Sequence, residues 1–340
     1  MSQEKEIQIL LKSNGINLSD FHTVETLTDA YIDYTTDIEI KKIKTGFPKL
    51  DNHIRGLRTQ ELLTVVAGTG IGKSALALNF LLNYARTTKE LTVLFSLEMS
   101  SVGIAERIFQ VELDKFGYEI EDSFIKQDGK FIESCKNLKS SLNNFVIITK
   151  RIEVHQIPAY VKIIELLKGK KVRLIGVDYV GIMENKTFPK DEYLRVTDNM
   201  KLLYSFAKIL DLAVINLSQV SRLDIKPGNN NGKLNLYSGK GSGEVENSSD
   251  FFITLERLDS VDGKDGIESE MFLTIQDYNS QFREHRFDLI LLSIHKNRRG
   301  KTGKIYAVFD RKNLRIKEYN ETDFNNYRPS GITGGKDIIL

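Results

Sequence analysis

The chain has 340 residues, 41% of them hydrophobic and 28% charged, which provides a full core for one large or two modest domains. No apolar run reaches the roughly 18 residues needed to cross a bilayer, and the charged amino terminus does not resemble a secretory signal. Composition therefore predicts a cytoplasmic protein without a membrane partner. The single cysteine, Cys135, excludes a disulfide framework and a multi-cysteine zinc site. The five histidines are scattered, which argues against a structural metal site.

The net charge of +2 is unevenly distributed along the chain. Residues 1–40 contain two lysines and eight acidic residues, so residues 41–340 carry a net charge of +8. A body of this sign suits a polyanionic partner, although the excess is small for so large a surface.

Residues 1–43 are expected to form a short helical arm. Apolar residues recur at helical spacing in Ile7–Leu11 and again in Asp20–Tyr34. An arm of this size cannot build an independent core. It must pack either on its own domain or on a neighbouring subunit, and the sequence favours neither.

The segment Glu61–Arg86 predicts a buried strand, a glycine-rich turn and a helix. The turn carries a phosphate-binding pattern whose first glycine is replaced by alanine. Its residues are Ala67, Gly68, Thr69, Gly70, Ile71, Gly72, Lys73 and Ser74. A chance glycine turn before a helix is the alternative, but the strand before it and the helix after it argue for a nucleotide site.

Small residues are needed in this turn because successive backbone N–H groups must face the phosphates, and a Cβ at Gly70 or Gly72 would obstruct them. Lys73 is expected to reach the β- and γ-phosphates of ATP, and Ser74 to offer its hydroxyl to Mg²⁺. The positive end of the following helix points at the same anion.

Strands and helices alternate after this turn. The predicted strands are 91–97, 145–149, 172–178, 213–217 and 250–256, and the predicted helices are 101–116, 153–167 and 191–210. The alternation predicts an α/β fold with a mostly parallel sheet flanked by helices. Ligands bind beyond the carboxyl ends of the strands in such sheets.

Polar side chains stand at the ends of three of these strands. Glu98, Asp178 and Gln219 follow buried apolar runs. A carboxylate there can hold Mg²⁺ and a second can act as general base, so we expect Asp178 in the first role and Glu98 in the second. Gln219 would sense the γ-phosphate. Each could instead be a solvated residue at a strand end, but three together after a phosphate loop weaken that alternative.

The loop 222–244 is rich in glycine and asparagine and should be mobile and basic. Its cations are Arg222, Lys226, Lys233 and Lys240. This composition suits a segment that binds a phosphodiester backbone without reading bases. An ordinary surface loop is the alternative.

The carboxyl-terminal part predicts a β-hairpin region. Residues 258–286 suggest an insertion of low regularity, and strands are expected at 287–295, 304–309 and 314–319. The turn 295–303 is rich in cations and is either solvated surface or a finger directed at a neighbour's nucleotide. Residues 321–340 are expected to be a flexible tail.

With these residues assembled, the chain resembles the ATPase domain of DnaB-type replicative helicases, members of the RecA-like superfamily. The resemblance covers about residues 44–320. It lies in Thr-Gly-Phe-x-x-Leu-Asp at 45–51, the phosphate loop, Phe-Ser-Leu-Glu-Met-Ser at 95–100, Val-Asp-Tyr-x-x-Ile-Met at 177–183, Leu-Ser-Gln at 217–219 and Lys-Asn-Arg-x-Gly-x-Thr-Gly at 296–303. The alanine at position 67 is typical of that family.

The resemblance implies an ATP-driven single-stranded-DNA translocase and helicase, moving 5′→3′ as a homo-oligomeric ring, expected to be a hexamer. It implies that Lys296 and Arg298 act on the neighbour's nucleotide, and that Gln219 couples nucleotide to DNA. A loader or a primase is a further expected partner.

The chain departs from the family pattern in its short arm, at Gly181, where glutamine is common, and at Lys240-Gly241. The short arm keeps open an ATP-gated DNA-binding scaffold that does not unwind. A nucleotide kinase is a third possibility, which the loop after Gln219 fits poorly.

Overall fold

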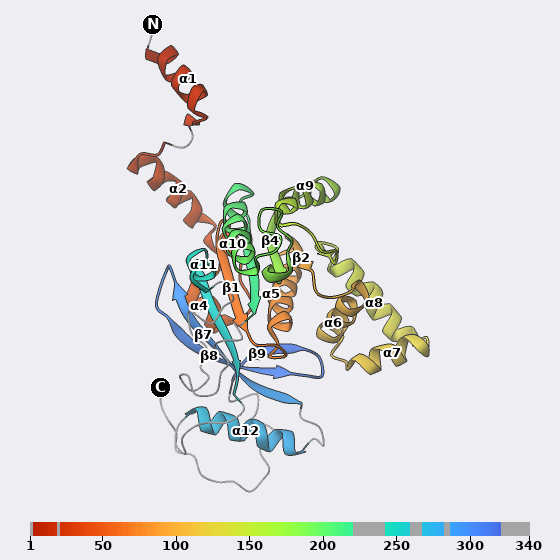
Figure 1. Cartoon of the computed structure of the whole chain (residues 1–340). Coiled ribbons are helices and arrows are strands. Elements are labelled where there is room, and N and C mark those ends of the chain that lie inside the picture. Colours follow the sequence, from red (N-terminus) through yellow and green to blue (C-terminus); the bar gives the residue numbers. More distant parts are fainter. Residues whose placement is uncertain (1–2, 19–20, 220–241, 259–266, 282–285, 321–340) are drawn as a thin grey trace. The chain divides into compact units, whose positions relative to one another are not determined.

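A computed structural model describes residues 3–18, 21–219, 242–258, 267–281 and 286–320 (Figure 1). The chain divides into two compact units, Met1–Lys42 and Ile43–Leu340. None of the helices in the described ranges is long and apolar enough to cross a membrane. The predicted tail lies outside the described residues.

The first unit is helical, as its apolar spacing predicts. It contains α1 (Gln3–Asn14), α2 (Val24–Thr36) and α3 (Ile38–Lys41). The second predicted helix begins at Val24 rather than Asp20, because the Thr23 hydroxyl accepts a hydrogen bond from the Thr26 N–H at 3.2 Å and caps the helix there. Neither α1 nor α2 buries a residue, so neither contributes to a core of this unit.

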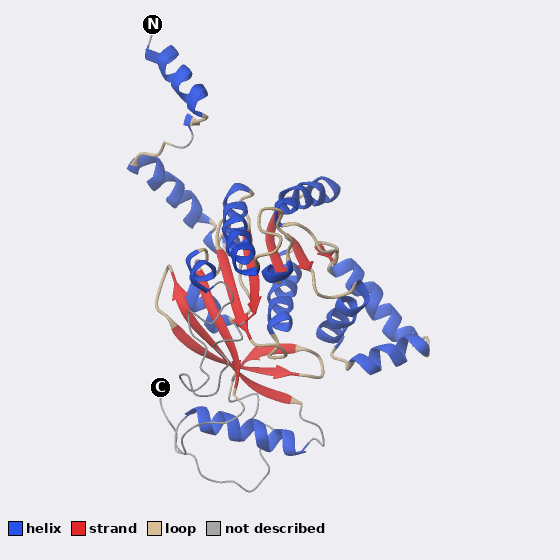
Figure 2. Cartoon of the chain, viewed as in Figure 1, coloured by secondary structure: helices blue, strands red, loops and turns tan. Residues whose placement is uncertain are grey.

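The second unit is built on one nine-stranded sheet (Figure 2). Its strands are β1 (Leu62–Ala67), β2 (Leu91–Ser96), β3 (Phe145–Ile148), β4 (Val172–Asp178), β5 (Ala213–Gln219), β6 (Phe251–Arg257), β7 (Phe287–Asn297), β8 (Gly303–Asp310) and β9 (Arg315–Glu318). The order across the sheet is β3-β2-β4-β5-β1-β6-β7-β8-β9.

The first six strands in that order are parallel, and β7, β8 and β9 continue the sheet as an antiparallel region. The predicted α/β class, the mostly parallel sheet and the carboxyl-terminal hairpins are therefore confirmed. β1 lies between β5 and β6, so the phosphate loop extends from the carboxyl end of a central strand.

Helices cover both faces of the parallel region, because alternate side chains of each strand enter two different cores. On β1, Leu63 and Val65 enter one core while Leu62 and Val66 enter the other. The first core is closed by α4 (Pro48–Ile54), α5 (Lys73–Thr88) and α6 (Ser101–Leu113). The second is closed by α9 (Ile157–Lys168), α10 (Glu192–Ile209) and α11 (Ser242–Asn247), with the short η2 (Val154–Gln156) and η3 (Val180–Ile182).

Two helices follow α6 that the sequence did not predict, α7 (Gly117–Ile125) and α8 (Gly129–Ser141). The first residue of each helix is a glycine, and because glycine is a poor helix former the sequence does not indicate where these helices begin. Side chains supply the caps instead. The Glu119 carboxylate accepts from the Phe116 N–H at 2.7 Å, and Asp128 accepts from the first N–H groups of α8.

The expectation of low regularity for 258–286 is wrong, because α12 (Ile267–Gln281) occupies much of it. Ile275 of this helix packs with Leu289 of β7 and Val308 of β8 in a small separate core. The Tyr278 ring lies against the Phe287 ring of β7, with the ring centres 4.9 Å apart. Three of its apolar residues, Met271, Phe272 and Leu273, are consecutive, which obscures the helical spacing in the sequence.

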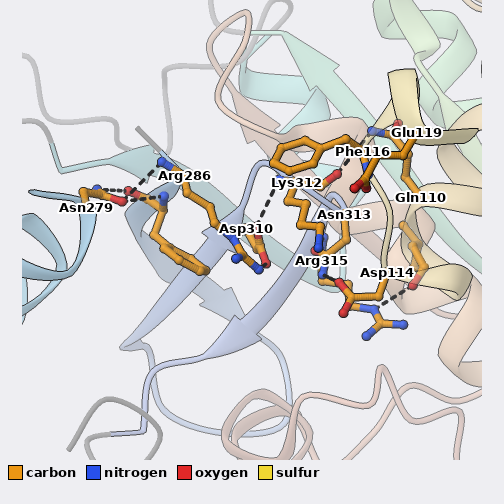
Figure 3. A network of polar contacts seen from close by, with 12 residues as sticks. Gln110, Asp114, Phe116, Glu119, Asn279, Arg286, Asp310, Lys312, Asn313 and Arg315 are labelled. Carbon is orange, nitrogen blue, oxygen red and sulfur yellow. Dashed lines mark hydrogen bonds and ion pairs between the residues drawn. The ribbon is translucent and has the colours of Figure 1, made fainter. Parts of the chain in front are cut away.

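Polar contacts tie the turn between β8 and β9 to α6 and to the segment after α12 (Figure 3). Arg286 forms a two-pronged ion pair with Asp310, at 3.0 and 2.8 Å. On the other side of the turn, Arg315 Nε donates to the Val111 carbonyl at 2.6 Å, and Asn313 donates to Asp114. These bonds fix the turn beside α6, which begins just after Glu98.

Candidate nucleotide site

The phosphate loop connects β1 to α5 as predicted. β1 ends at Ala67, the turn runs from Gly68 to Gly72, and α5 begins at Lys73. The amino terminus of this 16-residue helix therefore faces the space that the turn encloses. A helix terminus with free N–H groups and a partial positive charge is a ready anion site.

Backbone conformation, rather than space, explains the glycines. Gly70 and Gly72 have φ values of 79° and 105°, where side chains other than glycine are strained. A Cβ at Gly70 would meet no atom within 4 Å, and one at Gly72 would touch the Phe309 ring at an ordinary 3.5 Å. An added Cβ therefore meets no obstacle within the chain itself, and the predicted obstruction of bound phosphates stays a prediction.

Lys73 is a buried cation, only 8% exposed. Burial lowers the pKa of its ammonium group, and the carboxylates of Asp178 and Glu98 oppose that shift. Its Nζ lies 5.2 Å from the centre of the Tyr179 ring. A buried lysine between two carboxylates can neutralise part of the charge of a triphosphate.

Asp178 stands at the carboxyl end of β4 and is 5% exposed. Burial raises the pKa of its carboxyl, while a hydrogen bond from the Ser74 hydroxyl and the charge of Lys73 lower it. Its Oδ1 atom is buried and has no hydrogen-bond partner among the described residues. Asp178 and Ser74 therefore lie close together, as a shared role requires.

These groups fit Mg²⁺ bound together with a nucleotide. A buried carboxylate oxygen without a protein partner lies beside a hydroxyl, and both are hard oxygen donors. Within the described ranges no group of three or more His, Cys, Asp or Glu could hold a metal ion. Mg²⁺ does not need such a cage, because it usually takes one or two protein ligands and completes its shell with water and phosphate oxygens.

Glu98 and Gln219 lie at the carboxyl ends of their strands, as the phosphate loop does. Glu98 follows β2 by two residues and is exposed, and its charge acts on both Lys73 and Asp178. Gln219 is the last residue of β5 and lies in register with Ala67. Because β1, β2, β4 and β5 are parallel, their carboxyl ends bring together the predicted loop, carboxylates and amide.

The sequence did not single out three residues of this site, Ser96, Arg107 and Tyr179. Ser96 pairs with Asp178 in the β2–β4 register. Arg107 of α6 is close enough for its charge to lower the pKa of Asp178, and Tyr179 lies over Lys73. Register could have indicated Ser96, whereas nothing local in the sequence signals Arg107.

Gly181 has a steric reason of its own. A Cβ at this position would come within 2.7 Å of the Tyr179 ring, closer than real Cβ contacts allow. The ring that lies over Lys73 therefore requires glycine two residues later, unless it moves.

Arg298 lies near the amino-terminal ends of the parallel strands, opposite to the phosphate loop. It follows β7, and its N–H donates to the carbonyl of Asp250, whose own N–H bonds Leu62 at the start of β1. Its side chain donates to the Tyr204 hydroxyl at 2.9 Å, forms a 2.9 Å ion pair with Asp250, and is nearly half exposed. The structure therefore does not bring Arg298 to the phosphate loop of its own chain.

The neighbouring cations differ in exposure. Lys296 donates from Nζ to the Glu246 carbonyl at 2.7 Å, and burial lowers its pKa. Arg299 is only 11% exposed, forms a 3.0 Å ion pair with Glu61 and also contacts the Gly56 carbonyl. Arg299 thus joins two parts of its own chain, whereas Arg298 presents part of its guanidinium to solvent.

The predicted DNA-binding residues lie outside the described residues. They are Arg222, Lys226, Lys233 and Lys240.

Among curated proteins the chain is similar to two replicative DNA helicases named DnaB. It is 24% identical to that of Helicobacter pylori (strain ATCC 700392 / 26695) over 333 residues, which cover 90% of this chain and 66% of the relative. It is 27% identical to that of Geobacillus stearothermophilus over 309 residues, which cover 90% of this chain and 61% of the relative. The chain therefore spans less than two thirds of these relatives.

A solved structure titled "The Structure Of A DnaB-Like Replicative Helicase And Its Interactions With Primase" superposes with a TM-score of 0.70 at 20% identity. The match covers 88% of this chain and 69% of that chain, and it establishes a shared fold. The model of the DnaB-like helicase C terminal domain family matches residues 42–318, which include β1 to β9 and the phosphate loop. The chain belongs to the DnaB-like helicase C terminal domain family.

Proposed function

We propose that the chain is an ATP-driven single-stranded-DNA translocase and replicative helicase, working in the cytoplasm as a ring, expected to be a hexamer, that hydrolyses ATP at its subunit junctions. The observation that supports this proposal most strongly is that the phosphate loop, Asp178 and Glu98 lie together at the carboxyl ends of neighbouring parallel strands. Membership of a helicase domain family then favours DNA unwinding over other uses of ATP.

Each group has a chemical role in this proposal. Lys73 and the N–H groups of the loop bind the phosphates, and Ser74 and Asp178 hold Mg²⁺. The bound ion would neutralise charge that develops on the phosphates. Glu98 takes a proton from the attacking water, for which its exposed carboxylate near Lys73 is suitably placed.

Gln219 is proposed to couple the nucleotide to DNA. It ends β5 beside the phosphate loop, and the next residues of the chain lead into the basic loop. A hydrogen bond from its amide to the γ-phosphate would be lost on hydrolysis. The basic loop would bind the DNA backbone through Arg222, Lys226, Lys233 and Lys240.

The ring is supported by the position of Arg298. Arg298 lies at the far end of the parallel strands from its own phosphate loop, so it can reach a nucleotide only on another subunit. Lys296 lies beside Arg298 and is proposed to assist it. A loader or a primase is a further proposed partner.

Unwinding of a forked DNA duplex by the purified chain tests the proposal. We expect ATP-dependent strand displacement that requires a 5′ single-stranded tail, with Lys73→Ala as the inactive control. Hydrolysis and DNA binding without displacement would favour the alternative, an ATP-gated DNA-binding scaffold. Phosphate transfer to a nucleotide acceptor would instead identify a kinase.

A further inference from the structure

Two buried polar atoms without partners among the described residues belong to paired residues of neighbouring strands near the phosphate loop. Ser96 ends β2 and pairs in register with Asp178 at the end of β4. Ser96 is 1% exposed, and neither its Oγ nor Asp178 Oδ1 has a hydrogen-bond partner among the described residues. Unsatisfied buried groups are rare in folded proteins, so a neighbouring pair points to a shared ligand.

Both side chains point to the face of the sheet that carries the phosphate loop. Leu94 enters the core under α5 and Phe95 the opposite core, so alternation returns Ser96 to the α5 side. On β4, Val177 enters the opposite core, which places Asp178 on the α5 side as well. Because α5 begins with Lys73, this is the face on which the phosphates would lie.

Position along the strand distinguishes Ser96 from the other buried hydroxyl of β2. Thr92 lies on the same face, is fully buried, and donates to the Glu90 carbonyl at 3.2 Å. Its hydroxyl is satisfied within the chain. Only at the carboxyl end, beside Asp178, does the strand leave a buried hydroxyl unpaired.

We propose that Ser96 is a positioning residue whose hydroxyl, together with Asp178 Oδ1, holds a water ligand of the nucleotide-bound Mg²⁺. This inference rests on the proposed function, because it deepens the role of the same site. A water needs two or more polar partners in a buried position, and a hydroxyl and a carboxylate oxygen provide them. Ser96 would then set the affinity for the ion without touching the nucleotide.

A titration of the protein–ADP complex with Mn²⁺ tests this inference. Electron paramagnetic resonance measures binding as the loss of the signal of the free ion. We expect Ser96→Ala to raise the Kd for Mn²⁺ about 10-fold, as other losses of a supporting hydrogen bond do. Affinity for ADP without a divalent cation should stay unchanged. Ser96→Thr, which keeps the hydroxyl, should restore most of the Mn²⁺ affinity, and Thr92→Val is the matched control with unchanged affinity.

Thermal unfolding adds a readout that does not depend on the ion. If Ser96 Oγ has no protein partner, Ser96→Ala without nucleotide should melt at the same temperature as the parent or higher. A clearly lower melting temperature, or an unchanged Kd for Mn²⁺, would overturn the inference. If instead the parent protein binds no nucleotide, the proposed function itself fails.

Discussion

Arg298 and Lys73 lie at opposite ends of the parallel strands. Arg298 is tied to Asp250, which bonds the first residue of β1, whereas Lys73 begins the helix that follows the end of β1. At the usual rise per residue, the six residues of β1 span about 20 Å. Arg298, which the family resemblance associates with the γ-phosphate, therefore cannot reach a nucleotide bound at the phosphate loop of its own chain.

We predict that Arg298→Ala binds ATP almost normally but hydrolyses it about 10³–10⁵ times more slowly, the range for loss of an arginine that stabilises the transferring phosphoryl group. Steady-state phosphate release measures this. Mixing Arg298→Ala with Lys73→Ala should restore part of the activity, because a junction can combine the intact loop of one with the intact arginine of the other. A parental rate for Arg298→Ala alone would refute the role.

Arg299→Ala provides the matched comparison. Arg299 joins Glu61 to Gly56 from a buried position, so its loss leaves the Glu61 carboxylate without that partner. We expect a lower stability to urea, by about 3–5 kcal/mol as for other broken buried ion pairs, in place of a selective loss of hydrolysis. Equal effects of the two substitutions on turnover per folded molecule would contradict this separation.

Glu98→Gln should retain ATP binding and lose at least about 100-fold in hydrolysis, since the amide keeps the shape but cannot accept a proton. Fluorescent-nucleotide titration and phosphate release measure the two properties separately. Glu106→Gln, on the nearby helix α6, is the control that should leave both unchanged. Loss of nucleotide binding in Glu98→Gln would show that Glu98 is structural.

The sequence predicted the elements whose signals are local. A phosphate loop is contiguous in sequence, so the pattern in Glu61–Arg86 was enough to predict its strand, turn and helix. Alternation of strands and helices predicted the parallel sheet, and the rule for the carboxyl ends brought Asp178 and Glu98 to the loop. These inferences need the chain order but no distances.

What the sequence missed depends on register and burial. The pairing of Ser96 with Asp178 requires the alignment of two strands that are far apart in the chain. Arg298 and Arg299 are adjacent in sequence, yet only the fold buries one and exposes the other. α12 was missed because its stability comes from a small separate core with β7 and β8 rather than from a long apolar face.

Asn279 is predicted to hold α12 in place. Its amide accepts from the Phe287 N–H at 2.9 Å and the Arg286 N–H at 3.2 Å, and donates to the Phe287 carbonyl at 2.8 Å. Asn279→Ala would remove these three hydrogen bonds, at a cost of about 1–3 kcal/mol in urea unfolding. Thr274→Ala removes a hydroxyl that donates to the Glu270 carbonyl one turn earlier in α12, and it should change stability by less than about 0.5 kcal/mol.

The basic loop is predicted to bind DNA through charge alone. Neutralising Lys226, Lys233 and Lys240 together should weaken binding to all single-stranded sequences equally. The slope of log K against log salt should flatten by up to about 0.7 for each lost phosphate contact. Fluorescence anisotropy at several salt concentrations measures the slope. An unchanged slope would reduce the loop to ordinary surface.

His295 predicts a dependence of stability on pH. Its Nε2 lies 2.8 Å from the Thr254 hydroxyl, and burial lowers its pKa below the ordinary 6.5. A base whose pKa is lower in the folded state binds more protons when unfolded, so the free energy of unfolding rises with pH across this window. Its contribution is complete above about pH 6.5 and is lost as the pH falls through the folded-state pKa.

His295→Gln should therefore flatten the acid side of the stability profile, because glutamine can still bond Thr254 but does not titrate. One proton limits the slope that is removed to about 1.4 kcal/mol per pH unit. Urea unfolding at several pH values between 5 and 8 measures it, with His155→Gln, at an exposed position, as the control. A profile of His295→Gln that stays parallel to that of the parent would show that His295 is not the group whose protonation destabilises the fold.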